Sequence, residues 1–363
     1  MSPARRYEGR AMNRLAVRRR WFQVHRWIGL LLAAVIVPIT LSGAALVWSD
    51  GLDRLIHPAR HSTSGSVLLP LARYVAAVQP EVRDGVRIAN LVLPAQHGPV
   101  LVTLTAPAAL PDPRGRRLLI YLDPATARVL DVADGGTGVM RALHVLHGSL
   151  FVPGAGRLIV GWIGVALMVA SLTGLWLWWP VTGRIARGLR WRRQPSLAAN
   201  LHHMAGFWIA LPLFLLALTG AWISFPAFFG ALVGEPVQRR ALAIAQRPVA
   251  QPALEIDDVV ARGQPFAPSA PLRTIILPTE QQADWTLSYD TMPLRTVMVA
   301  DDSGTAAPGR AFAAAGGVSF AQWARRLHDG TGMGLAWQAL IFAAGLMPTL
   351  LAVTGVLMWW RRR

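Results

Sequence analysis

The chain contains no cysteine and no lysine, and it has few charged residues of any kind. The absence of cysteine excludes disulfides, thiolate zinc sites, iron–sulfur clusters and covalently attached c-type haem, because each of these needs sulfur. Charged residues make up only 15% of the 363 residues, whereas hydrophobic residues make up 53%. A soluble globular domain carries about 25% charged residues, so this composition indicates a membrane protein.

Four stretches are long and apolar enough to cross a lipid bilayer. They cover residues 27–48, 158–179, 207–228 and 335–360, and none of them contains a charged residue. A helix of 22 residues is about 33 Å long, which is sufficient for the hydrocarbon core. Tryptophans lie at many of the ends, as expected at the level of the lipid headgroups. The sequence therefore predicts four membrane-spanning helices, with the bilayer as a partner.

The distribution of charge predicts how these helices are oriented. Three short segments hold 16 of the 36 arginines and a single acid: residues 1–26, 180–201 and 361–363. The two long loops, residues 49–146 and 229–334, hold 19 arginines and 18 acids. Arginine is retained on the cytoplasmic side of a membrane, so we expect both termini to be cytoplasmic and both long loops external. The net charge of +17 then reflects topology and attraction to anionic lipid, with no nucleic-acid partner.

Each long loop predicts one helix and a short antiparallel sheet. In the first loop, helical spacing covers residues 69–78, and strands are expected at 87–93, 100–105, 118–122 and 128–132. In the second loop, a helix is expected at 254–261, with strands at 273–277, 285–289 and 295–300. Apolar residues alternate with polar ones in these segments, and Gly, Pro and Asp mark the turns between them. We therefore expect two small α+β modules.

A comparison at fixed offsets indicates that the chain is a duplicated two-helix unit. His25 and His202 each precede, by 18 residues, the glycine of a Ser-Gly or Thr-Gly pair. His147 and His328 each lie 27 residues before the glycine of a Thr-Gly pair in the following span. The offsets between the two halves are 177 and 181 residues. Four equivalent histidines thus lie near the starts of the four predicted spans.

This placement favours two facing pairs of imidazoles, one near each side of the membrane. Two imidazoles facing each other across a helical bundle, without carboxylates, suit the two axial positions of a b-type haem. Zinc fits less well because it needs three or four ligands. A proton relay would use acids within the spans, and none is present. A purely structural role for the four histidines is the remaining alternative.

Other histidines compete with these four. His203 adjoins His202 but points about 100° further around a helix, and the register of the repeat selects His202. His144 lies one helical turn before His147 and could replace it as a ligand or act as a second one. His57, His61 and His97 are expected to be solvated histidines of the first loop.

Four motifs in register resemble those of the PepSY-associated transmembrane family. They are His25-Arg26-Trp27-Ile28-Gly29, Leu146-His147-Gly148-Ser149-Leu150, Leu201-His202 through Gly206, and Leu327-His328-Asp329-Gly330. Residues 121–126, Tyr-Leu-Asp-Pro-Ala-Thr, resemble the final hairpin of a PepSY domain. The family includes iron-regulated inner-membrane proteins and ferric-siderophore reductases of bacteria.

The resemblance implies a multi-pass protein of the bacterial inner membrane that carries electrons outward through two b-type haems per chain. His25 and His202 would bind the iron of the cytoplasmic-side haem, and His147 and His328 the iron of the periplasmic-side haem. The acceptor would be ferric iron held by a siderophore, or another periplasmic electron acceptor. A separate cytoplasmic-side reductant or a quinol must supply the electrons, because no flavin or nicotinamide domain is encoded. The catalytic residues are not defined by the motifs.

The expected architecture is thus a membrane α-helical protein with two periplasmic PepSY-like modules inserted between spans one and two and between spans three and four. Along the chain we expect a basic cytoplasmic N-terminus (1–26), the first span (27–48), the first module (49–146), a periplasmic segment leading into the second span (147–179), a basic cytoplasmic loop (180–201), the third span (202–228), the second module (229–327), a periplasmic segment leading into the fourth span (328–360) and a cytoplasmic tail (361–363).

Two alternatives to siderophore reduction remain open from the sequence. A non-enzymatic membrane protein could use its PepSY-like modules to bind a periplasmic peptidase or another partner, with the histidines serving structure only. Alternatively, a haem electron-transfer protein could serve a different periplasmic acceptor. The first alternative predicts a colourless protein.

Overall fold

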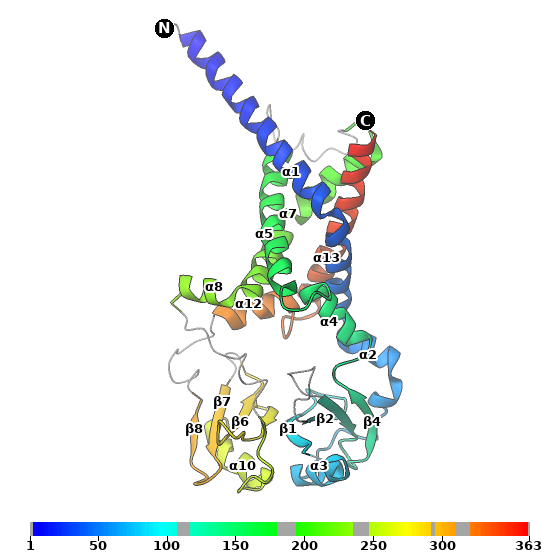
Figure 1. Cartoon of the computed structure of the whole chain (residues 1–363), viewed down its shortest axis with the longest axis vertical. Helices are drawn as coiled ribbons and strands as arrows, with labels where there is room; N and C mark the ends of the chain where they lie inside the picture. Colours follow the sequence, from blue (N-terminus) through cyan, green and yellow to red (C-terminus); the bar gives the residue numbers. More distant parts are fainter. Residues whose placement is uncertain are drawn as a thin grey trace. The chain divides into compact units, whose positions relative to one another are not determined.

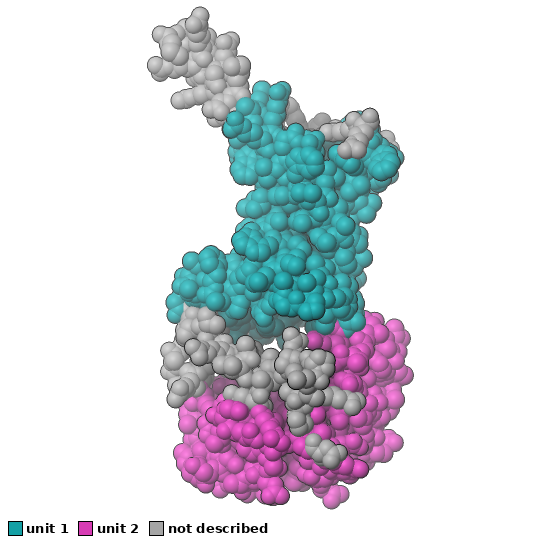
Figure 2. All heavy atoms as spheres, viewed as in Figure 1, with its two compact units in different colours: residues 1–49, 142–236, 320–363 teal, residues 50–141, 237–319 magenta. Residues whose placement is uncertain are grey.

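A computed structural model describes residues 3–83, 85–106, 117–179, 194–234, 247–291, 295–309 and 320–361, with backbone alone for residues 3–14. Most of the expected basic loop at 180–201 therefore lies outside the described residues. The chain forms two compact units, which Figure 2 shows in different colours. One unit comprises residues 1–49, 142–236 and 320–363, and the other comprises residues 50–141 and 237–319.

The first unit is built on four long helices, α1 (Pro3–Val47), α5 (Gly156–Trp178), α7 (Leu197–Ser224) and α13 (Leu335–Trp360) (Figure 1). All four are long and apolar enough to cross a membrane, α1 over its part Leu15–Val47. Helix α5 packs along α7, α1 packs along α13, and α7 also contacts α13. The four predicted apolar helices are confirmed.

Short helices adjoin the long ones: α4 (Val139–Ser149), α8 (Pro226–Leu232) and α12 (Phe320–Asp329). Helix α7 ends at Ser224, four residues before the expected end of the third span. Pro226 explains the difference, because it restricts the residue before it to non-helical backbone and restarts the helix as α8. The short turns after α4 and α12 contain the left-handed residues Phe151 and Gly330, which reverse the chain before α5 and α13.

The second unit is a single antiparallel sheet of eight strands in the order β4-β3-β2-β1-β5-β6-β7-β8. The strands are β1 (Arg87–Val92), β2 (Val100–Thr105), β3 (Arg117–Leu122), β4 (Val129–Asp134), β5 (Leu272–Ile276), β6 (Asp284–Tyr289), β7 (Arg295–Ala300) and β8 (Ala306–Pro308). The helical segments of the inserts are α2 (Ser49–Ile56), η1 (Pro58–His61), α3 (Leu71–Val78), η2 (Gln79–Glu81), α10 (Ile256–Gly263) and η3 (Gln264–Phe266). Each loop thus contains its expected helix, α3 or α10, and four strands, and the first loop also contains α2. Among the described strands, β8 is the one that the sequence pattern missed.

The two loops form one sheet and one core, where the sequence suggested two modules. Strands β1 and β5 pair edge to edge, with Leu91 opposite Ile275. The pairing satisfies backbone groups that two separate sheets would leave exposed at their edges. Asp257 of α10 also accepts hydrogen bonds from the backbone amides of Leu71 and Ala72 at the start of α3, at 2.7 and 3.1 Å. The second loop therefore caps a helix of the first.

Candidate functional site: two histidine pairs

The four histidines of the sequence repeat lie in two pairs within the first unit. His25 on α1 and His202 on α7 have ring centroids 6.3 Å apart, with the rings nearly perpendicular at 86°. His147 on α4 and His328 on α12 have ring centroids 5.9 Å apart, with the rings tilted by 41°. We call these the first and second histidine pairs. Each pair takes one member from each half of the sequence, as the spacing predicts.

The first histidine pair is oriented by hydrogen bonds at Nδ1. His25 Nδ1 lies 3.1 Å from the carbonyl oxygen of Ala170 and 3.1 Å from Thr173 Oγ1, both on α5. His202 Nδ1 lies 3.0 Å from Thr354 Oγ1 on α13. Both threonine hydroxyls already donate to carbonyl oxygens of their own helices. They therefore accept from the imidazoles, which fixes the proton on Nδ1 and leaves the lone pair on Nε2.

The second histidine pair has the same arrangement. His147 Nδ1 lies 2.8 Å from the carbonyl oxygen of Ile39 on α1. His328 Nδ1 lies 3.1 Å from the carbonyl oxygen of Leu216 and 3.1 Å from Thr219 Oγ1, both on α7. The Thr219 hydroxyl donates within its own helix, so it too accepts from the imidazole. A backbone carbonyl can only accept, and it places the proton of His147 on Nδ1 in the same way.

A glycine lets each imidazole approach the backbone of the facing helix. The distance from the imidazole Cε1 to a Cβ built on the glycine is 2.6 Å for Gly43 and His147, 3.0 Å for Gly220 and His328, 3.1 Å for Gly174 and His25, and 3.4 Å for Gly355 and His202. Each glycine directly follows a serine or threonine. In the sequence, these Ser-Gly and Thr-Gly dipeptides only marked the repeat. Their contacts with the imidazoles were missed, although the fixed spacing from each histidine was the available signal.

The members of the second pair are neutral at neutral pH. Burial and the neighbouring His147 imidazole lower the pKa of His328 to about 4. Burial also lowers the pKa of His147, although the hydrogen bond with Ile39 opposes that effect. A neutral imidazole with its proton on Nδ1 presents Nε2 as a metal ligand.

The spacing within each pair suits one metal atom between two imidazoles. A ligating imidazole nitrogen lies about 2.0 Å from a metal, and with ring centroids 6.3 and 5.9 Å apart the two imidazoles of each pair are close enough that both could ligate one metal atom. Across the described ranges, no group of three His, Cys, Asp or Glu side chains could hold a metal ion. The donor set of each pair is therefore two imidazoles, which fits the axial ligation of haem better than a tetrahedral zinc site.

The structure separates these four histidines from their competitors. It is His202 whose ring faces His25 and contacts Gly355, as the repeat register predicts over His203. It is His147 whose ring faces His328, so His147 is preferred to His144. His203 and His144 also make interactions within the chain.

Two of the loop histidines expected to be solvated have a different environment. His57 Nδ1 and His61 Nε2 lie 3.0 and 2.9 Å from the carboxylate of Asp53. His97 is exposed in the turn between β1 and β2. The expectation therefore holds for His97 only.

Comparison with known proteins gives the family of the chain. The family model described as the PepSY-associated TM region matches residues 22–362, which include both histidine pairs and the eight-stranded sheet. No curated protein matches the chain. The match covers nearly the whole sequence and includes all four motifs that carry the resemblance. The chain belongs to the PepSY-associated transmembrane family.

Proposed function

We propose that this protein is a di-haem b oxidoreductase of the inner membrane that carries electrons from a cytoplasmic-side donor to a periplasmic acceptor, ferric iron bound to a siderophore. The observation that carries the proposal is the recurrence of one arrangement at two places. The ring centroids of the two imidazoles lie 6.3 Å apart in the first pair and 5.9 Å apart in the second, and each ring is hydrogen-bonded at Nδ1 to a facing helix and lies against a glycine. A haem held between two imidazoles supplies one-electron chemistry, alternating between ferric and ferrous states.

In this proposal the chain positions and orients the imidazoles that would hold the haems. Hydrogen bonds from Nδ1 hold each ring at one orientation and raise the basicity of Nε2. The arginine-rich segments 1–26 and 180–201 favour a cytoplasmic position for the first pair, and the second pair would then lie on the periplasmic side.

Ferric iron is the substrate in this proposal, and the siderophore is its carrier. One electron reduces each ferric ion to ferrous iron, while the donor on the cytoplasmic side is oxidised by the same number of electrons. Hard-oxygen chelators hold ferrous iron much less tightly than ferric iron, so reduction releases the metal. The donor in this proposal is a separate reductase or a quinol on the cytoplasmic side.

Anaerobic reoxidation of the reduced protein tests this function. We expect protein reduced with dithionite and freed of excess reductant to be reoxidised by a ferric hydroxamate siderophore, with about one ferrous ion per haem captured by a ferrous-specific chelator. The His328→Ala variant should lose rapid reoxidation because the periplasmic-side site is missing. If ferricyanide reoxidises the wild type while ferric siderophores do not, the acceptor is a different one and the siderophore assignment is wrong.

A further inference from the structure

A cavity in the second unit is lined by basic and neutral polar groups. Its volume is about 250 Å³, and it is lined by Arg54, Pro58, His61, Thr63, His97 and Gly98. These residues come from the helical segments α2 and η1, the stretch after η1, and the turn between β1 and β2. The lining contains one guanidinium, two imidazoles and a hydroxyl, and no carboxylate. The cavity is therefore suited to a negatively charged ligand.

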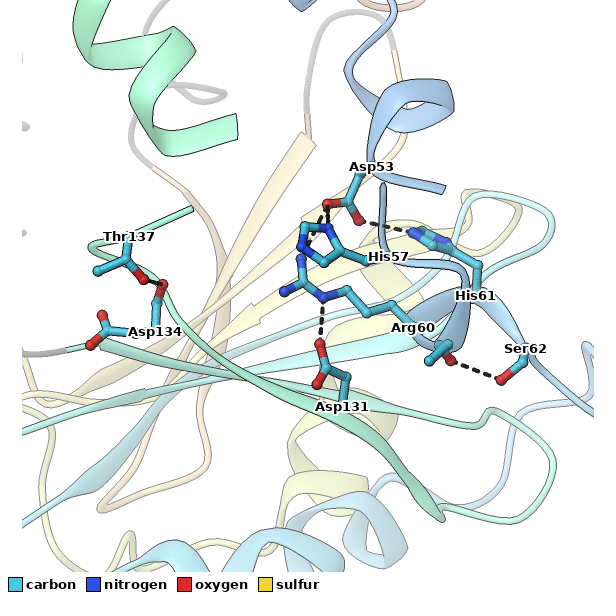
Figure 3. Close-up of polar contacts among 9 residues, drawn as sticks. Asp53, His57, Arg60, His61, Ser62, Asp131, Asp134 and Thr137 are labelled. Carbon is cyan, nitrogen blue, oxygen red and sulfur yellow. Dashed lines mark hydrogen bonds and ion pairs between the residues drawn. The ribbon is translucent and has the colours of Figure 1, made fainter. Parts of the chain in front are cut away.

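Two acids that are not among the lining residues hold the neighbouring basic groups in place, and Figure 3 shows the contacts of Asp53 and Asp131 with His57, Arg60 and His61. Asp53 accepts from His61 Nε2 at 2.9 Å and from Arg60 Nη1 at 3.1 Å. Arg60 Nε also donates to Asp131 at 2.6 Å, and its guanidinium lies 4.8 Å from the centre of the Tyr121 ring. Burial alone would raise the pKa of Asp53, but hydrogen bonds from His61 and His57 and the charge of Arg60 hold it below its usual value. Asp53 is thus ionised at neutral pH and fully engaged.

One cation at the cavity makes no ion pair. Arg54 is exposed and makes no ion pair within the described part of the chain. It contrasts with Arg60, which is paired with two acids. His61 does not add a donor, because its Nε2 already donates to Asp53 and its buried Nδ1 then offers a lone pair. The charge available to an anionic ligand is therefore that of Arg54.

Hydrogen bonds hold the segment that follows η1, which contributes Thr63 to the lining. Ser64, the neighbour of the lining residue Thr63, donates to the fully buried carboxylate of Asp123 through its backbone amide at 2.8 Å and its hydroxyl at 2.5 Å. Gly98, in the turn between β1 and β2, has a φ of +135°, a backbone conformation that favours glycine. These contacts fix the lining before any ligand arrives, which lowers the entropic cost of binding.

We propose that this cavity is a binding site for a small, multiply charged oxyanion bearing carboxylate or phosphate groups. The volume of about 250 Å³ lies below the range of about 300–1,000 Å³ that drug-sized ligands occupy, so a molecule of the size of citrate or phosphate fits it. Arg54, His97 and the hydroxyl of Thr63 supply donors for the oxyanion. The site is independent of the histidine pairs and of the proposed electron transfer.

Calorimetric titration of the full-length protein in detergent with citrate and, separately, with inorganic phosphate tests this site. We expect saturable binding of at least one of the two, and the one that binds identifies the carboxylate or the phosphate as the recognised group. Arg54→Gln should weaken binding about tenfold or more, because a charge-assisted hydrogen bond is lost. Arg73→Gln is the matched control, since Arg73 is an exposed arginine of α3 outside the cavity lining and its substitution removes the same charge.

Three results would overturn the proposal. They are the absence of saturable binding with both anions, an equal loss of affinity in Arg54→Gln and Arg73→Gln, and unchanged affinity in Arg54→Gln. A His97→Gln variant provides a second measurement, at the lining residue in the turn between β1 and β2. His97→Gln is expected to lower the affinity for the anion, as Arg54→Gln does. Unchanged affinity in both variants would place any bound anion elsewhere.

Discussion

Replacement of either member of a histidine pair by alanine is expected to remove one of two haem b groups and to leave the other in place. His25→Ala and His202→Ala should lose the haem of the first pair, and His147→Ala and His328→Ala that of the second. With one of the two imidazoles gone, a haem at that pair would lose half of its protein ligation and is expected to dissociate during purification. The measurement is haem per chain by pyridine haemochrome assay, with the visible spectrum of the reduced protein.

The neighbouring histidines provide matched controls for this expectation. His203→Ala and His144→Ala delete the same side chain at positions one residue and one helical turn away, but neither ring faces a partner imidazole in the pairs described. Both variants should keep two haems per chain. An equal loss of haem per chain in His202→Ala and His203→Ala would show that the imidazoles act through helix stability and not as ligands.

Alanine at the four glycines beside the imidazoles is expected to weaken haem binding in a graded order. The added Cβ would lie 2.6 Å from His147 at Gly43 but 3.4 Å from His202 at Gly355. Gly43→Ala should therefore displace the ring most and Gly355→Ala least. Nδ1 is hydrogen-bonded to the same helix, so the ring cannot move away without breaking that bond. A displacement of this kind should lower haem affinity about 10–100-fold, as with other changes around a metal ligand.

Gly51→Ala is the control, because nothing lies within 4 Å of a Cβ at that position and Gly51 belongs to α2 of the second unit. Alanine favours a helix over glycine by about 1 kcal/mol, so the substitution by itself should stabilise α2. Haem retention is measured by competition with apomyoglobin for each variant. If Gly43→Ala retains haem as firmly as Gly51→Ala does, the close approach of His147 to α1 is not part of the site.

The membrane unit could be predicted from sequence because its elements are set by local composition. Uninterrupted apolar stretches identified all four long helices, although α1 and α7 begin well before the expected residues 27 and 207, and α7 ends early at the break before Pro226. The pairing of His25 with His202 in space followed from the repeat, since equivalent positions in two halves meet across a bundle. The roles of the four histidines as ligands remain predictions.

The joining of the two loops could not be predicted in the same way. Pairing of β1 with β5 brings together strands about 180 residues apart, as with Leu91 and Ile275, and alternation within a strand does not encode its neighbour. Strand β8 is only three residues long and rich in alanine and proline, so it has no β pattern. The hydrogen bonds between Asp53 and its basic neighbours depend on the fold of η1, which is why His57 and His61 looked solvated.

The visible spectrum of the wild-type protein, purified in detergent from cells with sufficient haem, decides whether the histidine pairs hold cofactors. We predict about two b-type haems per chain, six-coordinate and low-spin in both oxidised and dithionite-reduced states, because each pair offers two imidazoles. A colourless protein from such cells would contradict the proposal and would leave the four histidines with a structural role.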